Sequence, residues 1–146
     1  MRSFTIPGEP VAKGRPRVTS RGITYTPAKT KNYETLVKEL YWAQYAGFGL
    51  MQGPLKLSVR AYFQIPKSAS KKRRIAMQEG KERPLKRPDV DNVIKAIADS
   101  LNGIAYGDDS QIVTATIEKY WGAPRVEVEI DELTYLADER AGMMEG

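Results

Sequence analysis

The chain has 146 residues, the size of one domain, and 23 Lys and Arg residues against 18 Asp and Glu residues give it a net charge of +5. It contains no His and no Cys, which excludes disulfides, thiolate or imidazole catalysis, iron–sulfur clusters and zinc knuckles. Any hydrolytic site must therefore rely mainly on carboxylates, whose oxygen atoms favour Mg²⁺ or Mn²⁺ over Zn²⁺.

Charge is unevenly distributed along the chain. Residues 1–88 carry 19 Lys and Arg against 5 Asp and Glu, a balance of +14, whereas residues 89–146 carry 4 against 13, a balance of −9. The two parts are therefore expected to have different functions, one basic and one acidic. No stretch approaches the roughly 20 apolar residues of a membrane span and no secretory signal is visible, so we expect no membrane partner and a cytoplasmic location.

The first elements are a short strand and a basic arm. Residues 2–6 alternate like a strand. Residues 10–19 combine turn-forming residues with basic side chains, which predicts an extended DNA-binding arm, although the same composition is typical of a solvated surface loop. A hairpin is expected over residues 17–26, with Gly22 in its turn. The cations of the arm are Lys13, Arg15 and Arg17.

A long helix and a long strand follow. Thr26 and Pro27 form a typical helix start, and apolar residues then recur every three or four positions to about residue 46. Residues 55–65 alternate apolar and polar side chains, which predicts a strand with one buried face. We expect the apolar face of each element to lie in the core.

A second basic segment precedes the acidic part of the chain. Residues 70–80 predict a short helix capped by Ser70, and basic side chains continue beyond it. Such a run is usually a solvated surface, but this one leads directly into a carboxylate motif, so we predict that it binds DNA. Its candidate DNA-binding residues are Lys71, Lys72, Arg73, Arg74, Lys86 and Arg87.

The remaining elements are one helix and two strands. A helix is predicted to begin near residue 89 and to end at residue 102, with strands over residues 111–121 and 124–131. The apolar stripe of the helix is Val90, Val93, Ile94, Ile97 and Leu101. The sequence thus predicts a small mixed α+β domain over residues 1–133, with a mixed or antiparallel sheet packed by two to three helices, and a tail over residues 134–146.

Two acidic clusters suggest a metal site. Within a helix, side chains two residues apart point about 200° from each other, so Asp89 and Asp91 converge only if Asp89 precedes the helix. Pro88 favours that arrangement because it ends an extended segment. Asp109, which follows Asp108, completes the set if the next strand lies beside the start of the helix. These two neighbouring carboxylates repel each other unless a cation lies between them.

Each carboxylate also has an ordinary structural explanation. Asp89 is in position to cap the helix, with Asn92 where a capping box places Glu or Gln. Asp91 suits the positive end of the helix dipole and lies one turn from Lys95, and the pair at residues 108–109 is typical of a turn. Their occurrence together, next to a basic run and in a chain without His or Cys, favours a Mg²⁺ site that faces a polyanion.

The same residues resemble a known family. The resemblance lies in Pro88-Asp89-Val-Asp91-Asn92-x-x-Lys95, Asp99-x-Leu101-Asn102-Gly103 and Asp108-Asp109-Ser110-Gln111-Ile112, with an upstream Pro7-Gly8-x-Pro10-x-x-Lys13-Gly14-Arg15-Pro16-Arg17. These motifs resemble the RusA-type Holliday junction resolvases and span most of residues 4–130.

The resemblance implies a homodimeric, Mg²⁺-dependent endonuclease, with Mn²⁺ as a substitute, that cuts four-way DNA junctions by paired symmetric nicks and needs no small-molecule cofactor. It matches Asp89, Asp91 and Asp109 to the catalytic, metal-binding carboxylates and Lys95 to the catalytic lysine. Asp108 is a secondary candidate metal ligand, and Asp99 matches a further acidic position. Two alternatives stay open: a non-catalytic basic DNA-binding module, and a nuclease for other branched DNA such as flaps.

Overall fold

Helices and strands combine in a mixed α+β architecture, as the sequence predicts. The computed structural model describes residues 1–12, 17–25 and 28–133. In chain order the elements are β1 (Arg2–Pro7), β2 (Arg17–Val18), β3 (Thr24–Tyr25), α1 (Ala28–Tyr45), β4 (Leu55–Phe63), α2 (Lys71–Gln78), α3 (Val90–Ser100), the 3₁₀ turn η1 (Asp109–Gln111), β5 (Ile112–Trp121) and β6 (Arg125–Glu132).

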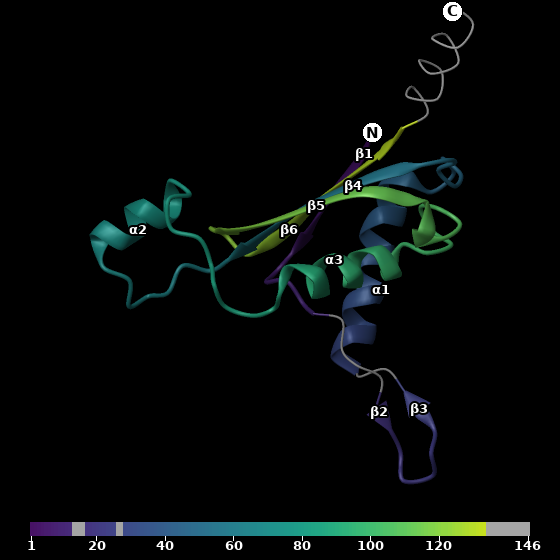
Figure 1. The fold of residues 1–146 in the computed structure, drawn as a ribbon, viewed down its shortest axis with the longest axis horizontal. Helices are drawn as coiled ribbons and strands as arrows, with labels where there is room; N and C mark the ends of the chain where they lie inside the picture. Colours follow the sequence, from purple (N-terminus) through teal and green to yellow (C-terminus); the bar gives the residue numbers. More distant parts are fainter. Residues whose placement is uncertain (13–16, 26–27, 134–146) are drawn as a thin grey trace, which may run out of the picture.

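One mixed sheet organises the domain (Figure 1). Its strand order is β1-β6-β4-β5. Strand β6 lies antiparallel to β1 and to β4, whereas β4 and β5 are parallel. Parallel neighbours need a long connection, and here the chain passes through α2 and α3 between β4 and β5. This connection brings α3 and the start of β5 to the same part of the molecule.

The core lies between the sheet and the two helices α1 and α3. Alternate residues of β4 are buried, as predicted, although the strand ends at Phe63 rather than at residue 65. Val93 and Ile97, from the predicted apolar stripe of α3, are buried. Val90, which is predicted to belong to the same stripe, is the first residue of the helix and is 42% exposed. Among the described residues, no helix is long and apolar enough to cross a membrane.

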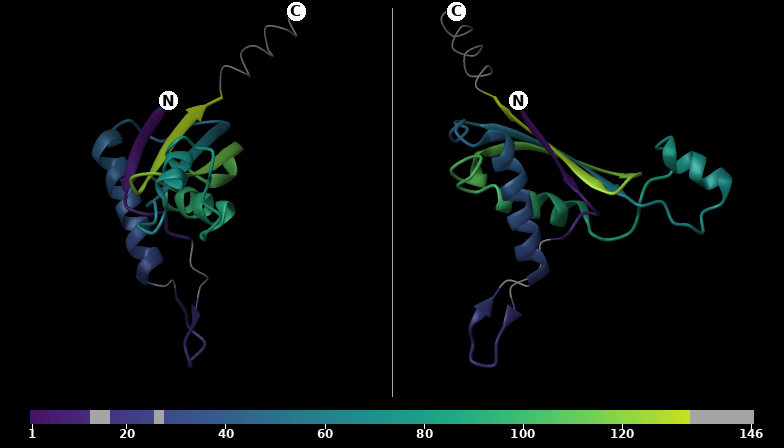
Figure 2. Two further views of the ribbon diagram at one scale, coloured as in Figure 1. Left: turned by 90° about the vertical axis from the view of Figure 1, so that its left-hand side faces the viewer. Right: turned by 180° about the vertical axis from the view of Figure 1, so that it is seen from behind.

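Two segments project from the domain in different directions (Figures 1 and 2). One is the β2–β3 hairpin, which is confirmed, with Gly22 at a φ of 80° in its turn. The other is the α2 segment, in which the Ser70 hydroxyl caps the helix as predicted by accepting from the Arg73 amide at 3.2 Å. The predicted helix start at Thr26 and Pro27 and the predicted tail at 134–146 lie outside the described residues.

Candidate active site

The N-terminal end of α3 carries two exposed carboxylates. Asp89 has an extended backbone (φ −71°, ψ 155°) and lies just outside the helix, and Asp91 lies in the first turn. This is the arrangement the sequence predicts from Pro88. The side chain of Asp89 makes no capping hydrogen bond, so the capping explanation is wrong for this residue. Both carboxylates are open to solvent and to a ligand.

The exposed side of α3 carries a lysine between two carboxylates. Asp91, Lys95 and Asp99 follow one another at intervals of four residues, and the helix buries Val93 and Ile97 on its other side. Over the eight residues from Asp91 to Asp99 an α-helix rises about 12 Å. Lys95 is exposed and makes no ion pair within the described part of the chain. The helix therefore separates its two carboxylate positions by roughly two turns.

The C-terminal end of α3 holds a second group of carboxyls. Asp109, the first residue of η1, is hydrogen-bonded to the side chains of Asp99 and Asn102. Partial burial, the hydrogen bond with Asp99 and the charges of Asp108 and Asp99 raise the pKa of Asp109. We call Asp99 and Asp109 the acidic pair. Burial and the neighbouring carboxyls thus both disfavour the ionised form of Asp109.

Asp108 has a structural role next to the acidic pair. Its carboxylate accepts from the Ser110 amide at 3.3 Å and caps η1. Hydrogen bonds from Ser110 hold the pKa of Asp108 below its ordinary value, opposite in direction to the shift of Asp109. The charge of Asp108 contributes to the raised pKa of Asp109, although burial and Asp99 contribute more. The turn explanation is confirmed for Asp108.

Gln111 fastens the turn that carries both aspartates. Its Oε1 accepts from the amides of Gly107 at 2.9 Å and Asp108 at 3.2 Å. Its Nε2 donates to the carbonyls of Met51 at 3.1 Å and Gly53 at 3.2 Å. Gln111 belongs to the motif at residues 108–112, which by itself predicts no role for this side chain. The available signal is its position three residues after Asp108, since a Gln at that spacing forms a capping box.

The structure brings together only part of the predicted carboxylate set. Asp109 lies with Asp99 at one end of α3, whereas Asp89 and Asp91 lie at the other. Within the described residues, no three His, Cys, Asp or Glu side chains gather into a group that could hold a metal ion. The metal-binding roles of Asp89, Asp91, Asp109 and Asp108 therefore stay predictions.

The acidic pair nevertheless fits a hard divalent cation. Its donors are carboxylate oxygens, and a cation between them offsets the burial and the neighbouring charges that raise the pKa of Asp109. Mg²⁺ in particular is usually held by one or two protein carboxylates, with water and substrate phosphate oxygens in its remaining positions. A group of three protein carboxylates is thus not required for the metal chemistry that the sequence predicts.

The predicted DNA-binding residues of α2 differ in their availability. Lys71 and Lys72 are exposed and make no ion pair among the residues described. Arg73 is instead paired with Glu82. Arg74 donates to two backbone carbonyls of the preceding loop at 3.0 and 3.3 Å. The two lysines are therefore the freer phosphate ligands of this helix.

The remaining predicted DNA-binding cations lie in two segments outside α2. The Nζ of Lys86 lies 3.8 Å from a carboxylate oxygen of Glu9, and Arg87 is exposed directly before α3. Three more predicted DNA-binding residues belong to the N-terminal arm, where Lys13 and Arg15 lie outside the described residues and Arg17 begins β2. The DNA-binding roles of all these residues stay predictions.

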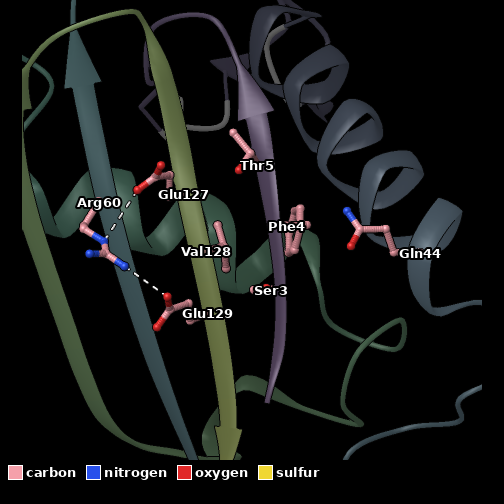
Figure 3. A pocket seen from close by; sticks show the side chains of 8 residues that line it. All are labelled: Ser3, Phe4, Thr5, Gln44, Arg60, Glu127, Val128 and Glu129. Carbon is pink, nitrogen blue, oxygen red and sulfur yellow. Dashed lines mark hydrogen bonds and ion pairs between the residues drawn. The ribbon is translucent and has the colours of Figure 1, made fainter.

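One hollow on the described surface lies away from the predicted site. It has a volume of about 470 Å³ and lies over β1, β6 and β4 (Figure 3). Arg60 points between two carboxylates there, at 3.6 Å from Glu127 and 3.0 Å from Glu129. The charged side chains that line this hollow are thus already paired with one another, and none of the predicted catalytic residues lies there.

Comparisons with known proteins show which family the sequence matches. The family model for the endodeoxyribonuclease RusA matches residues 7–131, which include both ends of the helix and η1. A protein of Bacillus subtilis (strain 168), named Uncharacterized protein YqaN, is 41% identical over 137 residues, covering 90% of this chain and 96% of the relative.

Proposed function

The chain belongs to the RusA endodeoxyribonuclease family, and from that membership we propose that it is a Mg²⁺-dependent enzyme that resolves four-way (Holliday) DNA junctions. It cuts phosphodiester bonds in two symmetric nicks, in recombination and repair. The observation that carries this proposal is the acidic pair at the C-terminal end of α3, where Asp99 and Asp109 lie together one helical turn from the exposed Lys95.

The carboxylates of α3 and η1 have the role of holding the metal. The proposed ligands hold two separate ions, Asp89 and Asp91 at the N-terminal end of α3 and Asp109 at its C-terminal end, with Asp99 as the hydrogen-bonded partner of Asp109 and Asp108 as a further candidate. When bound, Mg²⁺, or Mn²⁺ in its place, supplies a water of lowered pKa and offsets negative charge on the phosphate. In a chain without His, these carboxylates are also the groups that orient such a water.

Lys95 has the role of contacting the scissile phosphate. It is exposed and lies one helical turn from Asp91 and one turn from Asp99. Its ammonium group can therefore pair with a phosphate oxygen at either end of α3. A compact ammonium donor offsets the negative charge that develops as the phosphodiester bond breaks.

The projecting basic segments have the role of binding the DNA arms. The α2 segment offers Lys71 and Lys72 on one side of the domain, and the β2–β3 hairpin extends in another direction (Figure 2). Two separated contacts suit branched DNA better than a single straight duplex. A homodimer supports the same function, because a two-fold junction needs two cuts related by symmetry.

Cleavage of a synthetic four-way junction tests the proposal. The variant Asp91→Asn is compared with the wild type in Mg²⁺, and Asp131→Asn on β6 serves as the matched control. We expect Asp91→Asn to bind the junction and not to cleave it, while the control cleaves at the wild-type rate. Cleavage by Asp91→Asn at the wild-type rate contradicts the assignment.

A second candidate is a DNA-binding module without catalytic activity. The observation that favours it is the capping role of Asp108, which explains one carboxylate without any metal. Both candidates bind DNA with a strong dependence on salt, so binding does not separate them. The unfolding temperature separates the two candidates, because a specific divalent site raises it in the presence of Mg²⁺ or Mn²⁺. A plain DNA-binding module shows no such shift.

A further inference from the structure

Leu85 is a large apolar side chain that the fold leaves in solvent. It lies in the segment that returns from α2 to α3 (Figure 1). Leu85 is 97% exposed and belongs to neither apolar cluster of the described chain, whereas its neighbour Pro84 is buried. The next most exposed large apolar side chain among the described residues is Met1, at 76%. A single exposed leucine is common on protein surfaces, so its surroundings decide what it can do.

The chain on both sides of Leu85 is fastened to one residue of β5. Arg83 donates from Nε to the carbonyl of Lys119 at 2.6 Å, and its guanidinium lies 3.9 Å from the centre of the Tyr120 ring. The ammonium group of Lys119 in turn donates to the carbonyl of Lys86. These contacts fix the segment and leave the leucine side chain projecting from it. A side chain presented in this way loses little conformational freedom when it meets a ligand.

The residues that follow Leu85 suit a polyanion and lead to the candidate active site. Lys86 and Arg87 are both exposed. Asp89 comes four residues after Leu85, a length of chain that spans at most about 14 Å. Successive bases of a DNA strand are about 3.4 Å apart, so the two residues reach points on one strand roughly four base steps apart.

An exposed leucine beside cations has a known use in DNA recognition. Leucine and similar apolar side chains enter between neighbouring base pairs and unstack them, while nearby cations hold the phosphates. Unstacking is easiest where the bases are already incompletely paired or stacked, as they are at a branch point. Contact of this segment with the same segment of another copy would bring like charges together. The charges beside Leu85 therefore favour DNA as the occupant.

We propose that Leu85 enters the branch point of the DNA substrate as an apolar wedge and unstacks the base pairs there. Lys86 and Arg87 hold the neighbouring phosphates, and the opened strand then reaches Asp89. This inference rests on the proposed function, because it identifies how the same site distinguishes branched DNA from a linear duplex. Leu85 is a positioning residue in this account, since it contacts the bases and not the reacting phosphate.

The fluorescence of a 2-aminopurine base at the branch point tests the wedge, because this base brightens when it is unstacked. Protein is added to saturation to a four-way junction in Ca²⁺ in place of Mg²⁺, and gels confirm that the DNA stays intact. We expect the wild type to raise the fluorescence severalfold at the branch point and not in a linear duplex. Leu85→Ala is expected to lose most of this rise. A rise with Leu85→Ala equal to that of the wild type overturns the proposal.

Two further variants separate a wedge from a general loss of structure. The control Leu50→Ala makes the same change at a leucine that is 43% exposed in the loop after α1, and should keep the full rise. Leu85→Phe keeps a large apolar side chain and should recover most of the signal. Thermal melts of Leu85→Ala should match the wild type, because the leucine packs in no core. A Leu85→Phe signal no larger than that of Leu85→Ala overturns the proposal.

Cleavage measured on the same proteins in Mg²⁺ separates this inference from the proposed function. We expect Leu85→Ala to cut the four-way junction roughly 10-fold more slowly than the wild type. A wild type that opens the branch point but does not cleave supports the wedge and contradicts the nuclease assignment. A wild type that cleaves, while Leu85→Ala opens the branch point fully, contradicts the wedge alone. Unchanged fluorescence with a changed mass of Leu85→Ala in light scattering assigns the leucine to a contact between copies and overturns the proposal.

Discussion

The two ends of α3 differ in how their carboxylates are held. At the N-terminal end, Asp89 and Asp91 are exposed, and their side chains make no hydrogen bond or ion pair with the described part of the chain. At the C-terminal end, Asp109 is partly buried and hydrogen-bonded to Asp99 and Asn102. One helix thus presents an open acidic end and a preorganised acidic end.

The two ends of α3 therefore contribute differently to stability and to ligand binding. Holding Asp99 and Asp109 close together is unfavourable without a cation, as the raised pKa of Asp109 indicates. The fold compensates by fixing the turn around them through Asp108 and Gln111. The open end has no such supporting contacts, so its side chains are free to adjust to a ligand. We therefore expect substitutions at the two ends to affect stability and cleavage differently.

The largest expected effect is on cleavage by Asp109→Asn. Loss of a metal-binding carboxylate is expected to lower the rate on a four-way junction roughly 10²–10³-fold. The unfolding temperature at neutral pH is expected to stay equal or to rise. The raised pKa of Asp109 means that its ionised form disfavours the folded state, and Asn removes that charge. Kinetics and thermal melts measured beside Asp131→Asn check both effects.

The next effect is on stability and comes from Gln111→Ala. The substitution removes two hydrogen bonds that the side-chain oxygen accepts within the turn. It also removes the two that the side-chain nitrogen donates, which fasten η1 to residues 51–53. We expect a loss of about 1–3 kcal/mol in the free energy of unfolding, with slower cleavage because Asp109 is less well positioned. The control Gln64→Ala changes an exposed glutamine. Equal unfolding midpoints of the two variants in urea contradict a positioning role for Gln111.

A smaller effect is expected from the cap at Asp108. Asp108→Ala is expected to lower the free energy of unfolding by less than Gln111→Ala does, because η1 loses only its capping oxygen. Asp108→Ser keeps an oxygen at that place and should recover most of the loss. If Asp108→Ser restores stability and cleavage together, Asp108 acts as a cap. If it restores stability alone, Asp108 is also a metal ligand.

The smallest effect on stability is expected at the open end. Asp89→Ala should change the free energy of unfolding by less than about 0.5 kcal/mol, since its side chain makes no capping bond. Its cleavage rate should nevertheless fall with that of Asp91→Asn. A loss of stability as large as that of Asp108→Ala removes the distinction between an open and a preorganised end.

Local patterns predicted most of the elements because burial periodicity belongs to each segment by itself. The alternation of residues 55–63 and the apolar stripe around Val93 and Ile97 appear in the structure where expected. The parallel pairing of β4 with β5 could not be predicted in this way. Pairing depends on how two segments about 50 residues apart along the chain meet, which no local period encodes.

For the candidate site too, the sequence predicted local geometry but not the contacts between distant segments. Pro88 correctly indicated that Asp89 precedes the helix. The neighbours of Asp109 were not predictable, because they depend on the loop between α3 and η1. In that loop the Tyr106 hydroxyl donates to the carbonyl of Ala98 at 2.7 Å and returns the chain along the C-terminal half of the helix. Asp109 consequently meets Asp99 rather than the helix start.

Metal-dependent cleavage of branched DNA is the most direct test of the account. The time course of strand nicking is measured for a labelled four-way junction beside three-way, flap and linear DNA of the same sequence, in Mg²⁺ and in excess chelator. The account predicts paired nicks in the four-way junction, in Mg²⁺ only, with little cutting of linear DNA. Equal cutting with and without the metal, or no cutting of any branched substrate in Mg²⁺, contradicts it.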